Sequence, residues 1–263
     1  MGAAVWSATP EKMLEFPART LVTFFENHGF LQVEGRPKWL VVEGGSREWV
    51  RALLDRFQGE VRPSTPVLGI QRDERGVQVF MEPKESSTKR VETFDRVVLA
   101  THGDQALRIL GEEAKPLERE VLSSFQTQEN RAFLHTDERL LPRRPLARAA
   151  WNYHILPEDE RPQGATVSYW MNLLQGFEDG NPWIVSLNMG AQIAPEKIER
   201  EIVYRHPIYT TEAIAAQGRH SEINGLDRVY FAGAYWGYGF HEDGVKSALA
   251  VVKDFEGREK KVG

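Results

Sequence analysis

The chain has 263 residues, of which 41% are hydrophobic and 27% are charged, as in an ordinary globular protein of one or two domains. Its net charge of −5 leaves no basic excess to neutralise phosphates, which argues against a nucleic-acid binder. The absence of cysteine excludes disulfides, thiolate nucleophiles and cysteine-based metal sites, and favours a reducing cytoplasm. No apolar run is long enough to span a membrane and no basic flank marks a secretory signal, so we expect no transmembrane segment and a cytoplasmic location.

Two helices are expected near the N-terminus. The first begins at Thr9-Pro10, runs toward Gly29 and is kinked or divided at Pro17. The second follows the "GGS" turn with Ser46 as its cap and ends near Gly59, with one apolar face. Residues 65–81 predict a hairpin whose connection is residues 73–76. The run "FDRVVLATHGD" at 94–104 predicts a strand buried on both faces.

The middle third has a different character. Four segments rich in aromatic and β-branched residues, broken by Pro, Gly and Asn, predict strands near 130–137, 149–156, 165–174 and 182–190. The chain then returns to a strand, "DRVYFAG", and a closing helix. We therefore predict a mixed α/β fold, with an α/β layer from 39–104 and 220–257 and a mixed-sheet insertion between them.

The stretch "FAGAYWGYGFHEDGVKSAL" at 231–249 is the strongest candidate site. It passes from a strand through glycines into a helix, an arrangement that often holds a phosphate. Glu242 and Asp243 would repel a phosphate, so sugar hydroxyls or a ring carbonyl fit better, and a flavin offers both. The alternative is that the two carboxylates only cap a surface helix. The rings of Tyr235, Trp236, Tyr238 and Phe240 could pack on a flat ligand or on neighbouring loops.

These residues resemble the C-terminal FAD motif of the flavin amine-oxidase superfamily. The match is closest to a bacterial branch described as NAD/FAD-binding proteins, whose genes often lie beside cyclopropane-fatty-acid synthases. The resemblance spans nearly the whole chain, through "MGAAVWSATPEKMLEFPARTLVTFFENHGFL", "RPKWLVVEGGSREWV", "HTDERLLPRRPLARAAWNYHI" and "RHPIYTTEAIAAQGRH". It implies an incomplete Rossmann-like FAD-binding domain from 39–104 and 220–257, and a substrate-binding domain from 1–38 and 105–219.

The resemblance also implies roles for individual positions. Residues matching FAD contacts are Val67, Gly233, Ala234, Tyr235, His241, Glu242, Asp243, Gly244 and Val245. Residues matching the substrate cavity are Glu48, Tyr209 and Phe240, the last a phenylalanine where amine oxidases have tyrosine. No catalytic residue is assigned.

A flavoprotein of this type opens with a strand, G-x-G-x-x-G and a helix that carries the pyrophosphate. The chain has glycine pairs at Gly44-Gly45 and Gly237/Gly239, but neither has the third glycine. Residue 1 matches an interior point of the family, so we expect a C-terminal portion that binds FAD weakly or not at all. An N-terminal partner polypeptide is then expected to supply the missing unit.

Other candidates are weaker. The seven histidines show no metal-binding spacing, and structural roles are favoured. Arg139, Arg143, Arg144 and Arg148 could bind an anion, but a solvated loop paired with nearby acids is the simpler interpretation. Two hypotheses remain. The chain belongs to an FAD-dependent oxidoreductase acting on a small or lipid-like substrate, or it is a non-catalytic fragment or partner subunit of a split flavoprotein.

Overall fold

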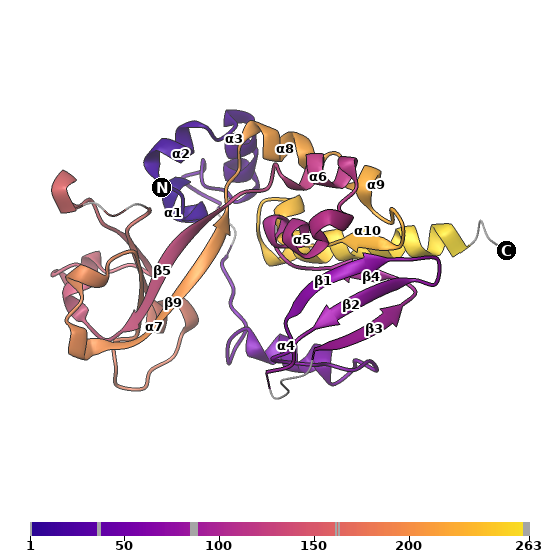
Figure 1. Ribbon diagram of the computed structural model, residues 1–263. Helices are drawn as coiled ribbons and strands as arrows, with labels where there is room; N and C mark the ends of the chain where they lie inside the picture. Colours follow the sequence, from indigo (N-terminus) through magenta and orange to yellow (C-terminus); the bar gives the residue numbers. More distant parts are fainter. Residues whose placement is uncertain (1, 36–37, 85–88, 161, 163, 260–263) are drawn as a thin grey trace. The chain divides into compact units, whose positions relative to one another are not determined.

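The computed structural model describes residues 2–35, 38–84, 89–160, 162 and 164–259 and shows a mixed α/β fold (Figure 1). The chain divides into two compact units, the first formed by residues 1–59 and 128–206 and the second by residues 60–127 and 207–263. The expected boundaries assigned residues 39–59 to the FAD-binding domain, whereas they lie in the first unit. They assigned residues 105–127 and 207–219 to the substrate-binding domain, whereas these lie in the second unit with most of the expected FAD-binding segments.

The first unit opens with three short helices, α1 (Gly2–Trp6), α2 (Pro10–Leu14) and α3 (Ala18–Asn27). The hydroxyl of Thr9 caps α2 by accepting the N–H of Lys12 at 3.1 Å. Pro17 separates α2 from α3, which confirms the predicted division. The rings of Trp6 and Phe24 pack with centroids 4.7 Å apart, so these helices bury an aromatic core.

The helix expected after the "GGS" turn is α4 (Arg47–Leu54), and it stops five residues before Gly59. The prediction of Ser46 as a side-chain cap was wrong, because Ser46 adopts helical dihedral angles and makes no capping hydrogen bond. None of the residues of α4 is buried, and Val50, Leu53 and Leu54 are exposed. Its apolar face therefore contributes nothing to the core of the first unit.

A five-stranded sheet with the order β6-β7-β8-β5-β9 makes up the rest of the first unit. Its strands are β5 (Thr127–His135), β6 (Trp151–Tyr153), β7 (Val167–Trp170), β8 (Ile184–Leu187) and β9 (Ile198–Pro207), and α7 (Met171–Gln175) follows β7. Three of these strands, β6, β7 and β8, lie within the predicted segments, β5 begins three residues before its predicted segment, and β9 had not been predicted. Strands β6–β7, β7–β8 and β8–β5 pair antiparallel.

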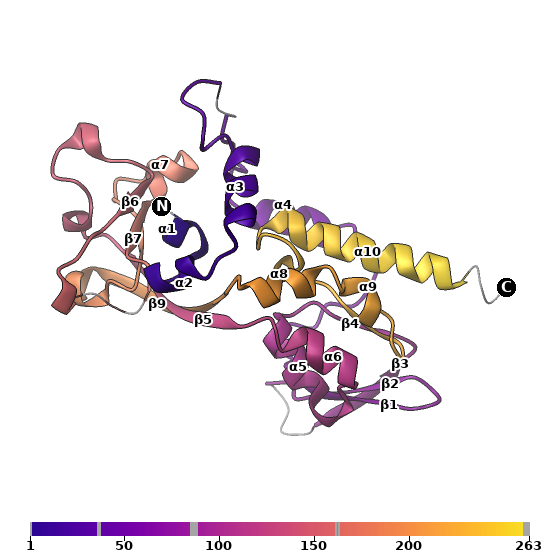
Figure 2. The same cartoon turned by 90° about the horizontal axis from the view of Figure 1, so that it is seen from above.

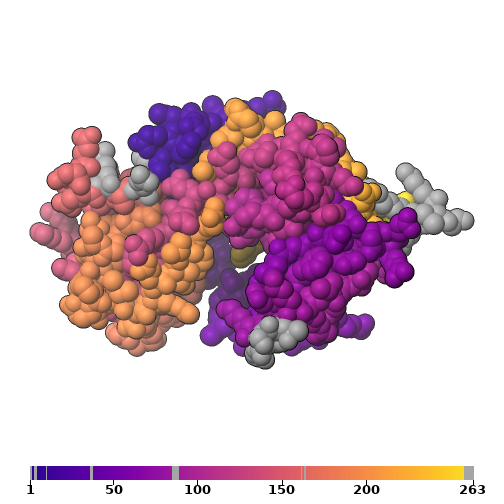
Figure 3. Space-filling model, in the orientation of Figure 1, coloured from indigo at the N-terminus to yellow at the C-terminus, as the bar shows by residue number. Residues whose placement is uncertain are grey.

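The second unit contains a three-stranded meander, β1 (Val67–Arg72), β2 (Val77–Met81) and β3 (Arg90–Phe94). The hairpin prediction is confirmed: Asp73 accepts the backbone N–H groups of Arg75 and Gly76 at 2.7 and 2.9 Å and closes the turn. The purple surface in Figure 3 is largely this meander. Its inward side chains Ile70, Val77 and Val79 are buried.

A parallel pair of strands, β4 (Val97–Leu99) and β10 (Val229–Phe231), lies beside the meander. The prediction of one strand over 94–104, buried on both faces, was wrong. Phe94 belongs to β3, the strand β4 has 3 residues, and Val98 is 41% exposed. β4 is covered on one face only, since Leu99 is buried beneath α5 and α6 whereas Val98 on the opposite face is open.

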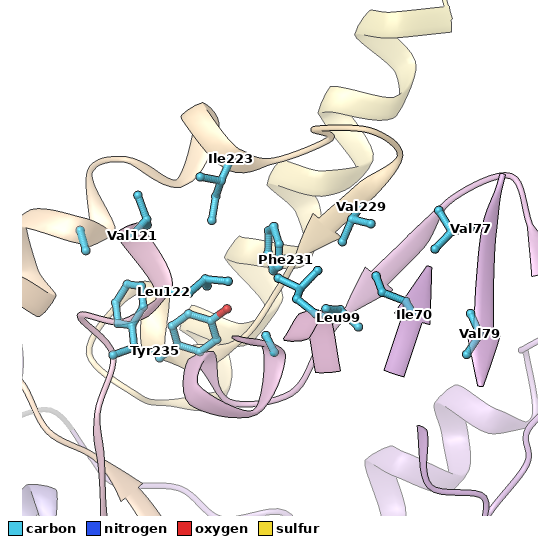
Figure 4. Packing of buried hydrophobic residues seen from close by; sticks show 14 of the residues in the cluster. Ile70, Val77, Val79, Leu99, Val121, Leu122, Ile223, Val229, Phe231 and Tyr235 are labelled. Carbon is cyan, nitrogen blue, oxygen red and sulfur yellow. The ribbon is translucent and has the colours of Figure 1, made fainter. Parts of the chain in front are cut away.

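Helices complete the second unit: α5 (Gly103–Leu110), α6 (Pro116–Leu122), α8 (Thr211–Gln217), α9 (His220–Ile223) and α10 (His241–Glu259). The longest, α10, runs beside α9 in both ribbon views (Figure 2). Figure 4 shows side chains of α6, α9, β4 and β10 converging on one core. Within the described part of the chain, no helix is long and apolar enough to cross a membrane.

Candidate functional site

The candidate site is the junction between β10 and α10. After β10 the chain passes through Ala232 and Gly233 into a short 3-10 turn, Ala234–Trp236, and enters α10 at His241. The Ala232 N–H donates to the carbonyl of Leu99 at 3.1 Å, so the turn begins where the parallel pair ends. A Cβ at Gly233 would lie 2.5 Å from a ring carbon of Tyr235. The position therefore requires glycine for close packing.

Two side chains that the sequence analysis had not singled out hold this junction in shape. Ser247 accepts the Gly233 N–H at 2.8 Å and donates to the Gly244 carbonyl at 2.7 Å, which ties the turn to the first turns of α10. Gln217, at the end of α8, donates to the carbonyls of Tyr235 and Gly237 at 2.9 and 2.6 Å. A serine inside a helix often bonds to a nearby carbonyl, but its partner from another segment could not be found without the fold.

The carboxylate of Asp243 also stabilises the turn of the junction. It accepts the N–H of Phe240 at 3.0 Å, and a Cβ at Gly237 would collide with it. The Tyr209 oxygen lies so near Gly239 that a Cβ there would collide with it, and Gly239 has a φ of 93°. Burial and the charge of Asp243 raise the pKa of Tyr209. The structure thus brings together Tyr209, Asp243 and the glycine turn.

The start of α10 remains approachable. A Cβ at Gly244 would meet only the backbone nitrogen of Ala234, at 3.9 Å. His241, Glu242 and Val245 are exposed around it, and Glu242 lies 3.6 Å from Lys246 in an exposed ion pair. The helix has 19 residues, so the positive end of its dipole lies here. An acidic first turn of this kind suits a neutral group with partial negative charge better than a phosphate.

Three of the four aromatic side chains of the junction separate into two kinds, and the fourth, Tyr238, is half-buried. Tyr235 is buried, and its ring and that of Trp236 pack against Phe125 with centroids 4.7 and 4.8 Å apart. Phe240 is 40% exposed beside the helix start. Packing against neighbouring elements thus explains Tyr235 and Trp236, so any contact of Tyr235 with a ligand would come from its backbone.

Three further residues are implied by the resemblance, and only Tyr209 lies at the junction. Val67 opens β1 opposite Met81, in the same unit as the junction. Tyr209 is 4% exposed and buried beneath the glycine turn. Glu48 lies in α4 of the first unit and pairs with Arg51 at 2.9 Å.

A row of polar side chains crosses the five-stranded sheet of the first unit. It runs from His135 through Ser186 and Ser168 to His154. The distances are 2.8 Å from His135 Nε2 to Ser186 Oγ, 2.6 Å from Ser186 Oγ to Ser168 Oγ, and 2.8 Å from Ser168 Oγ to His154 Nε2. Burial lowers the pKa of His135 to about 4 and also lowers that of His154. Within the described ranges, no group of three His, Asp or Glu side chains could hold a metal ion.

The arginine group belongs to the loop after β5. Arg139 makes a bidentate pair with Asp137, whose carboxylate also accepts the Ala194 N–H at 2.9 Å. Arg148 pairs with Glu138 at 2.9 Å. Two of the four arginines are thus paired with nearby acids.

Residues 7–186 match the family model described as flavin containing amine oxidoreductase. The chain belongs to this family. No curated protein matches it. The family uses a flavin, and the open, glycine-lined start of α10 is a place where the described residues fit one.

One solved structure shares the fold at low sequence identity, and a second gives a weaker match. The CLA-producing fatty acid isomerase from P. acnes is 16% identical, with a TM-score of 0.53 over 80% of this chain and 52% of that chain. The cyclohexylamine oxidase from Brevibacterium oxydans IH-35A is 14% identical, with a TM-score of 0.42 over 73% of this chain and 48% of that chain. The chain thus matches about half the length of each of these two proteins.

Proposed function

We propose that the chain supplies part of an FAD-dependent oxidoreductase that transfers a hydride from a C–N or C–C bond of a small or lipid-like substrate to the flavin. The observation that carries the proposal is the start of α10, where Gly244 leaves the helix backbone open within a family that uses flavin. When bound, the flavin accepts the hydride, and the protein positions and tunes it.

Each group of residues has a distinct part in this proposal. The backbone from Gly233 to Val245 would face the ribityl chain and the pyrimidine edge, with Asp243 holding the turn. Phe240 would stand on the substrate side and Tyr209 would support it from beneath the glycine turn, while Val67 would approach the adenine. His241 and Glu242, both exposed at the helix start, would border the same ligand.

The substrate face is proposed to lie on the sheet of the first unit, with Glu48 as a further contact. Trp151 and Tyr153 point to the same face of β6 and are 43% and 44% exposed. Tyr169 lies opposite Trp151 on β7, with ring centroids 5.2 Å apart. An open aromatic face suits an apolar substrate. The lipid-like class is further motivated by the P. acnes relative, which acts on a fatty acid.

The alternative is a partner subunit of a split flavoprotein, or a non-catalytic fragment. It is favoured by the absence of G-x-G-x-x-G from the 263 residues, because that motif normally carries the pyrophosphate. Under either hypothesis we expect the chain by itself to bind FAD weakly.

Titration of the purified chain with FAD, followed by quenching of flavin fluorescence, tests the proposal. Gly244→Glu should weaken the residual affinity about tenfold or more, since it adds bulk and negative charge at the helix start. Gly257→Glu makes the same change near the other end of α10, where a Cβ meets nothing within 4 Å, and should leave the affinity unchanged, as should Arg143→Ala.

Equal loss of affinity in Gly244→Glu and Gly257→Glu would contradict the assignment of the flavin to the start of α10. Tight, near-stoichiometric binding by the unmodified chain would contradict the expected weakness and leave the assignment of the site intact.

A further inference from the structure

The side-chain amide of Gln217 meets the glycine turn from the end of α8. Its Nε2 atom donates one hydrogen to the carbonyl of Tyr235 at 2.9 Å and the other to the carbonyl of Gly237 at 2.6 Å. A glutamine amide has two hydrogens to donate, so this side chain gives both of them to the turn. Because both partners are carbonyl oxygens, only the nitrogen end of the amide can face them, and the contacts fix its orientation.

The preceding carbonyls of the turn are bonded within the turn itself. The Gly233 carbonyl accepts the Trp236 N–H at 3.3 Å, and the Ala234 carbonyl accepts the Gly237 N–H at 3.0 Å. The carbonyls of Tyr235 and Gly237 are instead bonded by a side chain from another helix. The conformation of the second half of the turn therefore depends on α8.

These hydrogen bonds decide which polar groups a ligand meets at the start of α10. A carbonyl that accepts from Gln217 points at that side chain and not at a ligand lying over Gly244. The position that a Cβ of Gly244 would occupy lies 3.9 Å from the backbone nitrogen of Ala234. A ligand there lies beside a backbone nitrogen, while two carbonyl oxygens of the same turn are directed elsewhere. This polarity suits a ligand group that accepts hydrogen bonds, such as a ring carbonyl.

The end of α8 is anchored well enough to place the amide of Gln217. Ala216, the residue before it, is 4% exposed and belongs to the core of the second unit. Two residues after it, Arg219 donates to Glu120 of α6 at 2.5 Å. A polar group can position a ligand site when its own backbone is held in this way.

We propose that Gln217 is a positioning residue for the flavin, because it directs the carbonyls of Tyr235 and Gly237 toward α8 and keeps the start of α10 open to a hydrogen-bond acceptor. The inference rests on the proposed function, which assigns the flavin to the start of α10. Gly237 and Gly239 lie on either side of Tyr238 and give the backbone wide conformational freedom. Without the amide, the turn is free to direct these carbonyls outward, where they repel a ring carbonyl of the flavin.

Gln217→Glu gives a test in which pH restores the missing donor. A carboxylate has no hydrogen to donate and repels both carbonyls, whereas a protonated carboxyl group donates one O–H. The position is half-buried beside two carbonyl oxygens, which raises the pKa of the introduced carboxyl above its usual range. We therefore expect the affinity of this variant for FAD to rise as the pH falls.

Titration with FAD, followed by quenching of flavin fluorescence, measures this dependence between about pH 5 and about pH 8. Gln217→Glu should bind FAD at least about tenfold more weakly than the unmodified chain near pH 8 and recover part of the loss near pH 5. Gln217→Met keeps the shape without a donor and should be weakened at every pH. Each affinity is compared with that of the unmodified chain at the same pH, which removes the titration of His220 and Asp243 on the neighbouring helices.

Gln175→Glu is the matched control. Gln175 is exposed at the end of α7 and is followed by glycine, as Gln217 is at the end of α8. We expect this variant to bind FAD as the unmodified chain does at every pH. Far-ultraviolet circular dichroism establishes that each variant is folded.

Hydrogen exchange of the chain without FAD distinguishes this inference from the proposed function. The N–H groups of Gly237 and Gly239 donate to the Ala234 carbonyl, so their exchange reports the order of the turn. In Gln217→Met, exchange in residues 233–241 should be at least about tenfold faster.

Faster exchange in Gln217→Met without any FAD binding by the unmodified chain would overturn the proposed function and support the hold of Gln217 on the turn. Unchanged exchange in Gln217→Met would overturn the inference. A loss of affinity in Gln217→Glu that is the same at every pH would overturn it as well.

Discussion

The row of His135, Ser186, Ser168 and His154 has a defined direction. The backbone N–H of Asp137 donates to His135 Nδ1 at 3.0 Å, so the proton of the neutral ring is on Nε2 and is donated to Ser186. Ser186 can then donate to Ser168, and Ser168 to Nε2 of His154. A protonated His154 would present a donor where the row needs an acceptor, so both histidines are held neutral by geometry as well as by burial.

The first prediction concerns pH. In the folded chain the pKa of His135 is about 4, whereas an unfolded histidine titrates near 6.5. Between these values the unfolded chain binds a proton that the folded chain does not, so stability falls as the pH drops from about 6.5 toward about 4. The loss attributable to His135 is up to about 3 kcal/mol, and His154 adds to it in the same direction. Urea unfolding at a series of pH values measures this slope.

His135→Gln should flatten the slope, whatever its effect on overall stability. A slope of the same size in His135→Gln and the unmodified chain would contradict the role given to His135.

At the scale of elements, the meander of the second unit is fastened to α6 by a buried ion pair. Arg72 at the end of β1 donates to Glu118 of α6 at 2.6 Å, with side chains that are 6% and 0% exposed. The second oxygen of Glu118 accepts the N–H of Lys115 at 2.9 Å, so the same carboxylate caps its own helix. Arg72 also donates to the carbonyl of Glu113. Sequence spacing gives no hint of this clamp, because the partners are 46 residues apart.

Removing one partner of this ion pair should lower the free energy of unfolding. Glu118→Ala leaves the Arg72 guanidinium buried without its carboxylate, and we expect a loss of about 3 kcal/mol in unfolding free energy. Glu112→Ala alters an exposed glutamate six residues earlier in the chain and should change stability by less than about 0.5 kcal/mol. Guanidinium denaturation provides the measurement.

The double variant Arg72→Met/Glu118→Leu should be more stable than Glu118→Ala alone, because it removes both charges and keeps the volume. A double variant less stable than Glu118→Ala would show that the clamp contributes more than the avoidance of an unpaired charge.

At the scale of the whole molecule, each of the two units has its own buried core. In the second unit the core gathers residues of β1, β2, β4, β10 and the helices around them. In the first unit separate clusters lie on the two faces of the five-stranded sheet. Units with separate cores need not unfold together.

We therefore expect two thermal transitions in differential scanning calorimetry. Val77→Ala empties part of the core of the second unit, where Val77 is 0% exposed, and should lower one transition at a cost of about 2 kcal/mol. Val167→Ala, in the first unit, is the matched change at a site 1% exposed and should lower the other transition. A single transition lowered equally by both variants would mean that the units unfold as one.

Local sequence was sufficient for the features that local physics controls. Thr9, Pro17 and the Asp73–Gly76 turn act through neighbours in the chain, and each does in the structure what its residue type predicts. The resemblance at 227–249 likewise pointed to the family that the match over residues 7–186 shows. Ser46 failed as a cap because the chain entering α4 is already helical there, which residue preference cannot reveal.

Tertiary structure alone decided which residues serve the junction and which strand residues are exposed. Composition placed Tyr235 and Trp236 in the site, but Phe125, 110 residues before Tyr235, supplies the surface against which they pack. Ser247 and Gln217 gained their roles only because α8 and α10 meet at the glycine turn. The continuous apolar run "VVLA" predicted a strand, yet the exposure of Val98 depends on how many strands lie beside it. A strand's periodicity determines which side chains share a face, whereas the neighbours that cover that face come from distant parts of the chain.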